Sequence, residues 1–98
     1  MIIIIVGSGG RENILAEKLN NGTNKLYCIG ESRNPDIAKN VIFLMTTPLN
    51  NIECMLDYCN IIKPDMIVIG PEIVLNTNFV ERCNKKQYYC VGPCQDLA

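Results

Sequence analysis

Residues 2–10 read IIIIVGSGG: four isoleucines and a valine, followed at once by a glycine-rich loop. A β-branched run without polar alternation is typical of a strand buried on both faces, as in a parallel sheet. Residues 11–20 then carry a helical pattern, with Leu15 and Leu19 on one face. A buried strand, a glycine loop and a helix in this order predict the opening unit of a Rossmann-like α/β domain.

The rest of the chain continues to alternate apolar runs with helical patterns. Further strands are expected at residues 26–29, 41–44, 66–69 and 88–91, and a loop with one helical turn at residues 32–39. Thr47 is the expected N-cap, and Pro48 the first residue, of a helix with an apolar stripe from Ile52 to Ile62. The face of the next helix is marked by Leu75, Phe79, Val80 and Cys83. This alternation predicts a three-layer α/β/α sandwich with a parallel sheet, and residues 1–98 are expected to form a single domain.

The charge balance excludes two classes of partner. Nine Lys and Arg residues stand against ten Asp and Glu residues, a net charge of −1. Such a chain has no electrostatic basis for binding nucleic acid or an anionic membrane surface. The first apolar run, residues 1–6, is too short to span a membrane, and no basic residue precedes it as in a signal peptide. We therefore expect a cytoplasmic protein.

Six cysteines raise the question of disulfides or zinc. The chain has no C-x-x-C pair and no histidine, so the usual zinc spacings are missing and no metal site is expected. In a reducing compartment the thiols stay free. Cysteines in apolar runs pack as small hydrophobic side chains, and we expect this of Cys28, Cys59, Cys83 and Cys90. Cys94 follows a Gly-Pro pair and is expected in a loop, with no neighbouring base to make it a nucleophile.

Four of the five expected strands end in an apolar residue followed by glycine, at Gly7, Gly30, Gly70 and Gly92. The carboxyl ends of parallel strands lie along one edge of the sheet, and open α/β sheets bind their ligands there. Glycine at such an edge allows a sharp turn and the close approach of a ligand. The plainer interpretation is that strand ends need turn residues.

The glycine loop is the strongest local feature. Backbone N–H groups around Gly9 and Gly10, together with the positive end of the helix, predict an anion site, most naturally for phosphate. Arg11 can pair with a phosphate, and Glu12 can accept hydrogen bonds from ribose hydroxyls or an amine; the alternative is a surface pair. The dinucleotide fingerprint G-x-G-x-x-G is incomplete, because Glu12 stands at its third glycine. Glu31 is placed as a ribose-binding acid would be, or is a solvated loop carboxylate.

A second carboxylate follows the fourth expected strand, in the segment Gly70-Pro71-Glu72. The first and fourth strands are neighbours in the commonest strand order of these sheets. Glu72 is therefore expected to face the same crevice as the loop from Gly7 to Glu12. The alternative is an acidic residue that merely leads into a helix.

Four motifs together resemble the N-terminal region of phosphoribosylamine–glycine ligase, also called glycinamide ribonucleotide synthetase. They are GSGGRE at 7–12 followed by Leu15-Ala16 and Lys18-Leu19, Asn34-Pro35 before Ile37-Ala38 and Asn40-Val41, VIGPE at 68–72 followed by Leu75, and Val91-Gly92-Pro93 followed by Leu97. Their order and spacing cover essentially all 98 residues. Two positions depart from the family pattern: Asn13 replaces the usual histidine, and Asp36 replaces the usual glycine.

The resemblance implies a pre-ATP-grasp domain of an ATP-grasp ligase in purine biosynthesis. Such an enzyme activates glycine with ATP and magnesium as an acyl phosphate, which the amine of 5-phosphoribosylamine attacks. The products are glycinamide ribonucleotide, ADP and phosphate. ATP and Mg²⁺ would be bound by later domains that this chain does not contain, so the chain alone is expected to be inactive and to hold no catalytic residue. The residues expected to bind the ribosylamine substrate are Gly9, Gly10, Arg11, Glu12, Gly70, Pro71 and Glu72.

Three other interpretations remain open from the sequence. The first is the nicotinamide dinucleotide-binding domain of an oxidoreductase, which the glycine loop and Glu31 favour and Glu12 disfavours. The second is a nucleotide-sensing module without catalytic activity. The third is the first domain of another ATP-grasp carboxylase or ligase, which would share the fold but not all four motifs.

Overall fold

The computed structural model describes residues 1–70 and 78–91. The expectations for Pro71, Glu72, Leu75 and Cys94, and for the glycine at position 92, lie outside these residues. Within them, five parallel strands form one sheet in the order β3-β2-β1-β4-β5. The strands are β1 (Ile2–Val6), β2 (Lys25–Gly30), β3 (Phe43–Thr46), β4 (Met66–Ile69) and β5 (Cys90–Val91).

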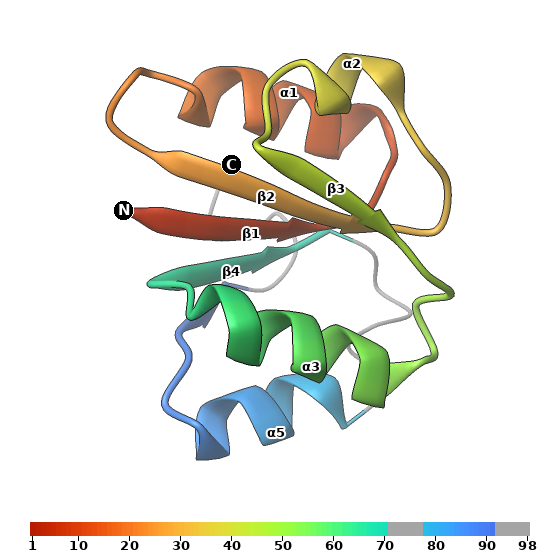
Figure 1. Ribbon diagram of the computed structural model, residues 1–98, viewed down its shortest axis with the longest axis vertical. Helices are drawn as coiled ribbons and strands as arrows, with labels where there is room; N and C mark the ends of the chain where they lie inside the picture. Colours follow the sequence, from red (N-terminus) through yellow and green to blue (C-terminus); the bar gives the residue numbers. More distant parts are fainter. Residues whose placement is uncertain (71–77, 92–98) are drawn as a thin grey trace.

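Helices cover both faces of this sheet (Figure 1). One face carries α1 (Gly10–Leu19) and α2 (Pro35–Ala38), and the other carries α3 (Ile52–Ile62) and α5 (Phe79–Lys85). The expected three-layer α/β/α sandwich with a parallel sheet is therefore confirmed.

The central strand β1 explains why residues 2–6 are uniformly apolar. Ile3 and Ile5 pack on the side of α1 and α2, whereas Ile4 and Val6 pack on the side of α3 and α5. All four side chains are at most 1% exposed. Because successive side chains of a strand point to opposite faces, a strand covered on both faces needs an apolar residue at every position.

The expected start of the third helix is wrong. Thr47 is not its N-cap: its N–H donates to the Gly30 carbonyl at 2.9 Å, which continues the pairing of β2 and β3. The helix α3 begins at Ile52 instead, and the side chain of Asn51 caps it by accepting the Cys54 N–H at 3.2 Å. Pro48 belongs to the turn before the helix, where its carbonyl accepts the Asn51 N–H at 3.0 Å.

Other boundaries differ less. Strand β3 begins at Phe43, two residues later than expected, and β5 begins at Cys90 instead of residue 88. Tyr88 precedes the strand because its N–H donates to the Cys83 carbonyl at 3.0 Å, while Gln87 has a positive φ of 65°. The Tyr88 N–H is therefore engaged by the end of α5, and pairing with β4 begins at the Tyr89 carbonyl, which accepts the Ile67 N–H at 2.8 Å.

The cysteines of the described residues are free thiols. Cys28, Cys59 and Cys83 are fully buried, as expected, and Cys90 is partly buried against the same core as α3 and α5. Among residues 1–70 and 78–91, no helix is long and apolar enough to cross a membrane.

Candidate functional site

The carboxyl ends of β1 and β4 lie side by side, as expected from the usual strand order. Val6 pairs with Ile69, and the Gly70 N–H donates to the Val6 carbonyl at 3.0 Å. On the other side of β1, the Gly7 N–H donates to the Ile29 carbonyl at 2.7 Å. The glycine loop and Gly70 therefore leave the sheet at the same edge, where α/β sheets bind ligands.

Gly7 makes the sharp turn out of the sheet. Its φ of +129° is one that residues with a Cβ rarely adopt. The chain then passes through Gly9, the extended N-cap residue of α1, and enters the helix at Gly10. Gly9 and Gly10 are both exposed, and a Cβ at Gly10 would meet nothing within 4 Å. The start of α1 is therefore open to solvent, and backbone N–H groups at such an exposed helix start can receive an anion.

Glu12 is the buried member of the loop, with only 6% of its surface exposed. Its Oε1 accepts the Gly9 N–H at 3.0 Å. Its side chain also fills the space beside two glycines: a Cβ would lie 2.5 Å from Oε1 if built on Gly7, and 2.4 Å from Oε2 if built on Gly70. Glu12 therefore sits between the ends of β1 and β4, and these two glycines provide the room for it.

This burial is the feature that sequence analysis missed. The sequence places Glu12 in the first turn of a helix, where a carboxylate is favoured by the helix dipole and is ordinarily solvated. The available signal was the coincidence of three features: glycine at the ends of two adjacent strands, and an acidic residue where the dinucleotide fingerprint has its third glycine. The Glu12 side chain fills the space that side chains at positions 7 and 70 would otherwise occupy.

The thiol of Cys28 lies beneath the loop and donates to the Gly7 carbonyl at 3.3 Å. Burial, together with the smaller effect of the negative charge of Glu12, raises the pKa of Cys28 to about 12. Cys28 therefore stays protonated at neutral pH and serves as a donor to the loop.

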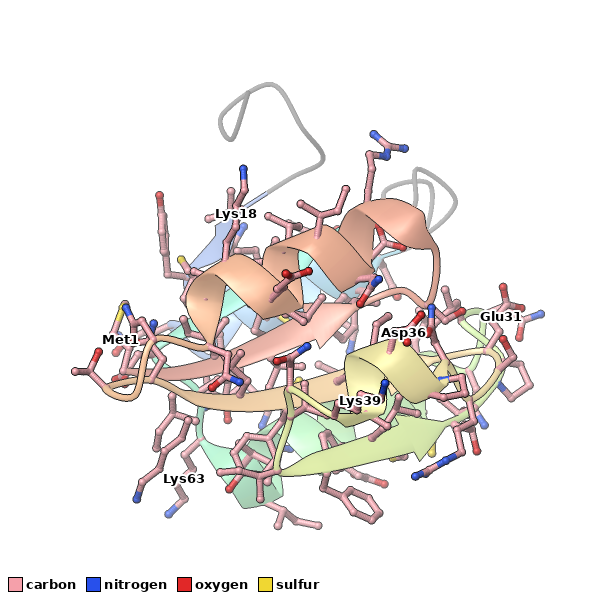
Figure 2. All side chains as sticks on the ribbon, turned by 90° about the horizontal axis from the view of Figure 1, so that it is seen from above. Met1, Lys18, Glu31, Asp36, Lys39 and Lys63 are labelled. Atoms are coloured by element: carbon pink, nitrogen blue, oxygen red, sulfur yellow. The ribbon has the colours of Figure 1, made fainter. Side chains whose placement is uncertain are left out.

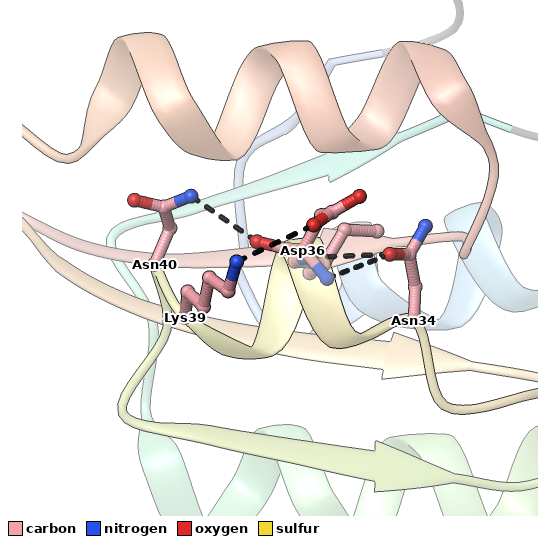
Figure 3. A network of polar contacts seen from close by, with 5 residues as sticks. Asn34, Asp36, Lys39 and Asn40 are labelled. Carbon is pink, nitrogen blue, oxygen red and sulfur yellow. Dashed lines mark hydrogen bonds and ion pairs between the residues drawn. The ribbon is translucent and has the colours of Figure 1, made fainter.

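Asn34 ties the next loop to the glycine loop. Its Nδ2 donates to the Ser8 carbonyl at 3.0 Å, while its Oδ1 accepts the N–H groups of Asp36 at 3.0 Å and Ile37 at 3.4 Å. The two bonds that Oδ1 accepts cap α2, which begins with Pro35 at its first position (Figure 3). The sequence indicated Asn34-Pro35 only as part of a family resemblance. In the structure Asn34 both caps α2 and bonds to the glycine loop.

Further polar contacts lie within α2 and the turn that follows it. The Nζ of Lys39 lies 3.7 Å from the Asp36 carboxylate, and the Asn40 side chain donates to the Asp36 carbonyl at 3.2 Å (Figure 3). Asp36 stands at the position where the family pattern has glycine, and it fits the first turn of α2, where an acidic side chain is favourable.

Of the other two charged residues expected at the site, Arg11 lies next to the glycine loop and Glu31 follows β2. Arg11 is exposed in the first turn of α1 and thus lies beside Gly10. Glu31 is exposed directly after β2, at the end of the molecule opposite Met1 (Figure 2). The structure gathers Gly9, Gly10, Arg11, Glu12 and Gly70 at the carboxyl ends of β1 and β4, in the middle of the sheet edge. In the part of the chain that the structure describes, no three Cys, Asp or Glu side chains lie together so that they could hold a metal ion.

These features define a class of protein: a Rossmann-like α/β domain with a glycine loop and a buried acid at the carboxyl ends of its central strands. The family model described as "Phosphoribosylglycinamide synthetase, N domain" matches residues 1–98. The chain belongs to this family, as its sequence motifs indicated.

The curated relatives that the chain matches are phosphoribosylamine–glycine ligases. The chain is 33% identical over 98 residues to a phosphoribosylamine–glycine ligase of Methanobrevibacter smithii, covering 100% of this chain and 22% of the relative. It is 31% identical over 94 residues to the ligase of Methanocaldococcus jannaschii, covering 95% of this chain and 21% of the relative. The chain therefore spans about a fifth of the length of the relatives that it matches.

Solved structures share the fold. The ADP complex of an N5-carboxyaminoimidazole ribonucleotide synthetase has a TM-score of 0.72 at 15% identity, with coverage of 91% of this chain and 22% of that chain. The NAD complex of a dTDP-glucose 4,6-dehydratase from Bacillus anthracis has a TM-score of 0.65 at 16% identity, with coverage of 94% and 37%. The same fold thus occurs in a ribonucleotide synthetase and in a dehydratase with bound NAD. The family match over residues 1–98 does not favour the interpretation as a nicotinamide dinucleotide-binding domain.

Proposed function

We propose that this chain is the substrate-binding N-terminal domain of a phosphoribosylamine–glycine ligase. The whole protein joins glycine to 5-phosphoribosylamine, hydrolyses ATP to ADP and phosphate, and releases glycinamide ribonucleotide. The family match over residues 1–98 supports this proposal. We assign ATP and Mg²⁺ to the other parts of the ligase, and place the enzyme in the cytoplasm.

The observation that carries the substrate assignment is the exposed start of α1. Gly10 presents an open backbone at the positive end of a ten-residue helix, next to Gly9, whose N–H is bonded to Glu12, and Arg11 adds a cationic side chain there. A phosphate group is the natural ligand of such a helix start. In the proposal, the phosphate of 5-phosphoribosylamine binds at Gly9, Gly10 and Arg11.

The remaining part of the substrate would extend toward β4. The carboxylate of Glu12 and the backbone at Gly70 lie on that side of the loop. We propose that Glu12, Gly70, Pro71 and Glu72 surround the ribose and the amine, since carboxylates accept hydrogen bonds from hydroxyl and amino groups. This domain then contributes by holding the nucleophile in place, and none of its residues is assigned a proton-transfer step.

Substitution of Gly10 tests the phosphate site. Because a Cβ at Gly10 meets nothing within 4 Å, Gly10→Val leaves the packing intact while its branched side chain obstructs the helix start. We expect the variant of a ligase containing this domain to show a KM for 5-phosphoribosylamine raised about tenfold or more, with the KM for ATP unchanged, as for the loss of one charge-assisted hydrogen bond. Glu17→Gln, a neutralised acid on an exposed position of the same helix, is the matched control.

Glu72→Gln tests the other side of the site. Glu72→Gln is expected to weaken the binding of 5-phosphoribosylamine about tenfold to a hundredfold, while the binding of ATP is unaffected. If Gly10→Val and Glu72→Gln weaken the binding of ATP instead and leave the binding of 5-phosphoribosylamine unchanged, the assignment of this edge to the ribosylamine is wrong.

The 98-residue chain alone should release no phosphate from ATP in the presence of both substrates. Turnover would contradict the assignment of ATP to other parts of the ligase.

A further inference from the structure

Glu12 occupies a position with a defined meaning in dinucleotide-binding domains. In the pattern G-x-G-x-x-G, the third glycine lets the helix pack closely on the strand, and the pyrophosphate binds at the start of the helix. Gly7 and Gly9 fit the first two positions, and Glu12 stands at the third. The helix nevertheless packs on the sheet, because Gly7 and Gly70 give space to the Glu12 side chain.

The Glu12 carboxylate is itself an anion at the place where the loop would receive one. It accepts the Gly9 N–H at 3.0 Å, so this amide is already engaged by an acid of the same chain. Only 6% of Glu12 is exposed, and its charge is therefore weakly screened by water. A second anion at the start of α1 finds one donor occupied and a negative charge a few ångström away.

We propose that Glu12 is the specificity-determining residue of this edge. Its fixed negative charge weakens the binding of pyrophosphates and bare anions, and it favours a ligand that brings hydrogen-bond donors next to its phosphate. The selection against pyrophosphates follows from the position of Glu12 alone. Only the identity of the favoured ligand, a phosphorylated ribosylamine, rests on the proposed function.

Two variants separate the charge of Glu12 from its volume. Glu12→Gln keeps the side-chain shape and an oxygen that can accept the Gly9 N–H, but removes the charge. Glu12→Gly removes the whole side chain and completes the pattern G-x-G-x-x-G from Gly7. The control is Glu17→Gln, which makes the same charge change at an exposed position of α1. Inorganic pyrophosphate, NAD and ribose 5-phosphate are titrated into each protein, and amide NMR shifts report both binding and folding.

We expect Glu12→Gln to bind pyrophosphate about tenfold more tightly than the unchanged chain, the order of effect of one partly screened charge at short range. Glu17→Gln should leave the affinity unchanged, and Glu12→Gly should gain measurable binding of NAD at the residues of the glycine loop. A folded Glu12→Gln that binds pyrophosphate no better than the unchanged chain overturns the proposal. The result for Glu12→Gln decides the matter even if Glu12→Gly does not fold.

The binding of ribose 5-phosphate distinguishes failure of the proposed substrate site from failure of the proposal about Glu12. If it binds none of the proteins while Glu12→Gln gains pyrophosphate affinity, the proposed substrate site fails and the role of Glu12 stands. If the unchanged chain binds ribose 5-phosphate and Glu12→Gln binds it more weakly, both are supported. If Glu12→Gln gains affinity equally for ribose 5-phosphate and pyrophosphate, Glu12 is not selective and the proposal is wrong.

Discussion

The carboxylate of Glu12 lies directly against the α-carbon of Gly70, so that a Cβ on Gly70 would fall 2.4 Å from Oε2 and 2.6 Å from the carboxyl carbon. This contact joins the first turn of α1 to the end of β4, two segments far apart in the sequence. It fixes the spacing between the glycine loop and the segment that begins at Gly70. The sheet edge proposed to bind substrate therefore depends on glycine at one position and on a buried acid at the other.

Gly70→Ala should destabilise the domain. The new methyl group must displace a buried carboxylate that is bonded to the Gly9 N–H, and overpacking of this kind costs about 1–3 kcal/mol. Chemical denaturation measures the loss. Gly10→Ala is the control, because its Cβ enters open space and alanine is the better helix former, so stability should hold or rise.

A double substitution identifies the cause of that loss. Combining Gly70→Ala with Glu12→Ala removes the clash, so the cost of the alanine at position 70 should be much smaller in that background. Equal costs in the two backgrounds would mean that Glu12 is not what requires glycine there.

Substitutions of Asn34 should separate its two roles. Asn34→Asp keeps an oxygen to cap α2 but loses the donor to the Ser8 carbonyl, whereas Asn34→Ala loses both. We expect Asn34→Ala to cost about 1–2 kcal/mol of stability and Asn34→Asp to cost less. In NMR spectra of Asn34→Asp, the amides of the glycine loop should shift while those of α2 stay in place. Unchanged loop amides would contradict the link to Ser8.

Substitution by phenylalanine should affect stability differently at Tyr58 and at Tyr88. The Tyr58 hydroxyl is buried and has no hydrogen-bond partner among the described residues, whereas the Tyr88 hydroxyl donates to Asn60 Oδ1 at 2.9 Å. Tyr58→Phe should therefore leave the melting temperature unchanged or raise it, since it removes an unpaired buried polar group. Tyr88→Phe should lower the stability by about 1 kcal/mol. A lower melting temperature for Tyr58→Phe would reveal a partner for its hydroxyl.

Thiol labelling should distinguish buried from accessible cysteines. Cys28, Cys59 and Cys83 are 0% exposed and should react with a thiol reagent only after a denaturant is added. Cys54 and Cys90 are partly exposed and serve as internal references. Rapid labelling of all six cysteines in native buffer would contradict the packing of this core.

The domain should lose stability in alkaline solution. Folding raises the pKa of Cys28 from 9.0 to about 12, because burial disfavours the thiolate. The unfolded chain releases this proton first, so the free energy of unfolding falls as the pH rises from about 9 toward 12, by at most about 1.4 kcal/mol per pH unit for one thiol. The stabilisation is fully present below pH 9. Denaturation curves at several pH values measure the slope, and Cys28→Ala should make it shallower; an unchanged slope would contradict this origin.

Much of the fold could be predicted because local patterns and tertiary packing agree. The uniformly apolar residues 2–6 require cover on both faces, and this requirement alone leads to a parallel sheet between two layers of helices. Gly7 and Gly70 mark the ends of neighbouring strands at the ligand edge. The prediction of a helix start at Thr47 was wrong because Thr47-Pro48 is a pattern typical of a helix start. In the structure the Thr47 N–H is bonded to the carbonyl of Gly30, in the neighbouring strand β2.

By itself the sequence determined the order of the elements, the sheet with its glycine edge and the family, since these depend on residue type and on spacing along the chain. Only the tertiary structure decided the place of Glu12. The space that receives its carboxylate exists only when β1 and β4 pair and bring Gly7 and Gly70 together. A side chain at the start of a helix is solvated or buried according to what lies opposite, and here two glycines from adjacent strands lie opposite.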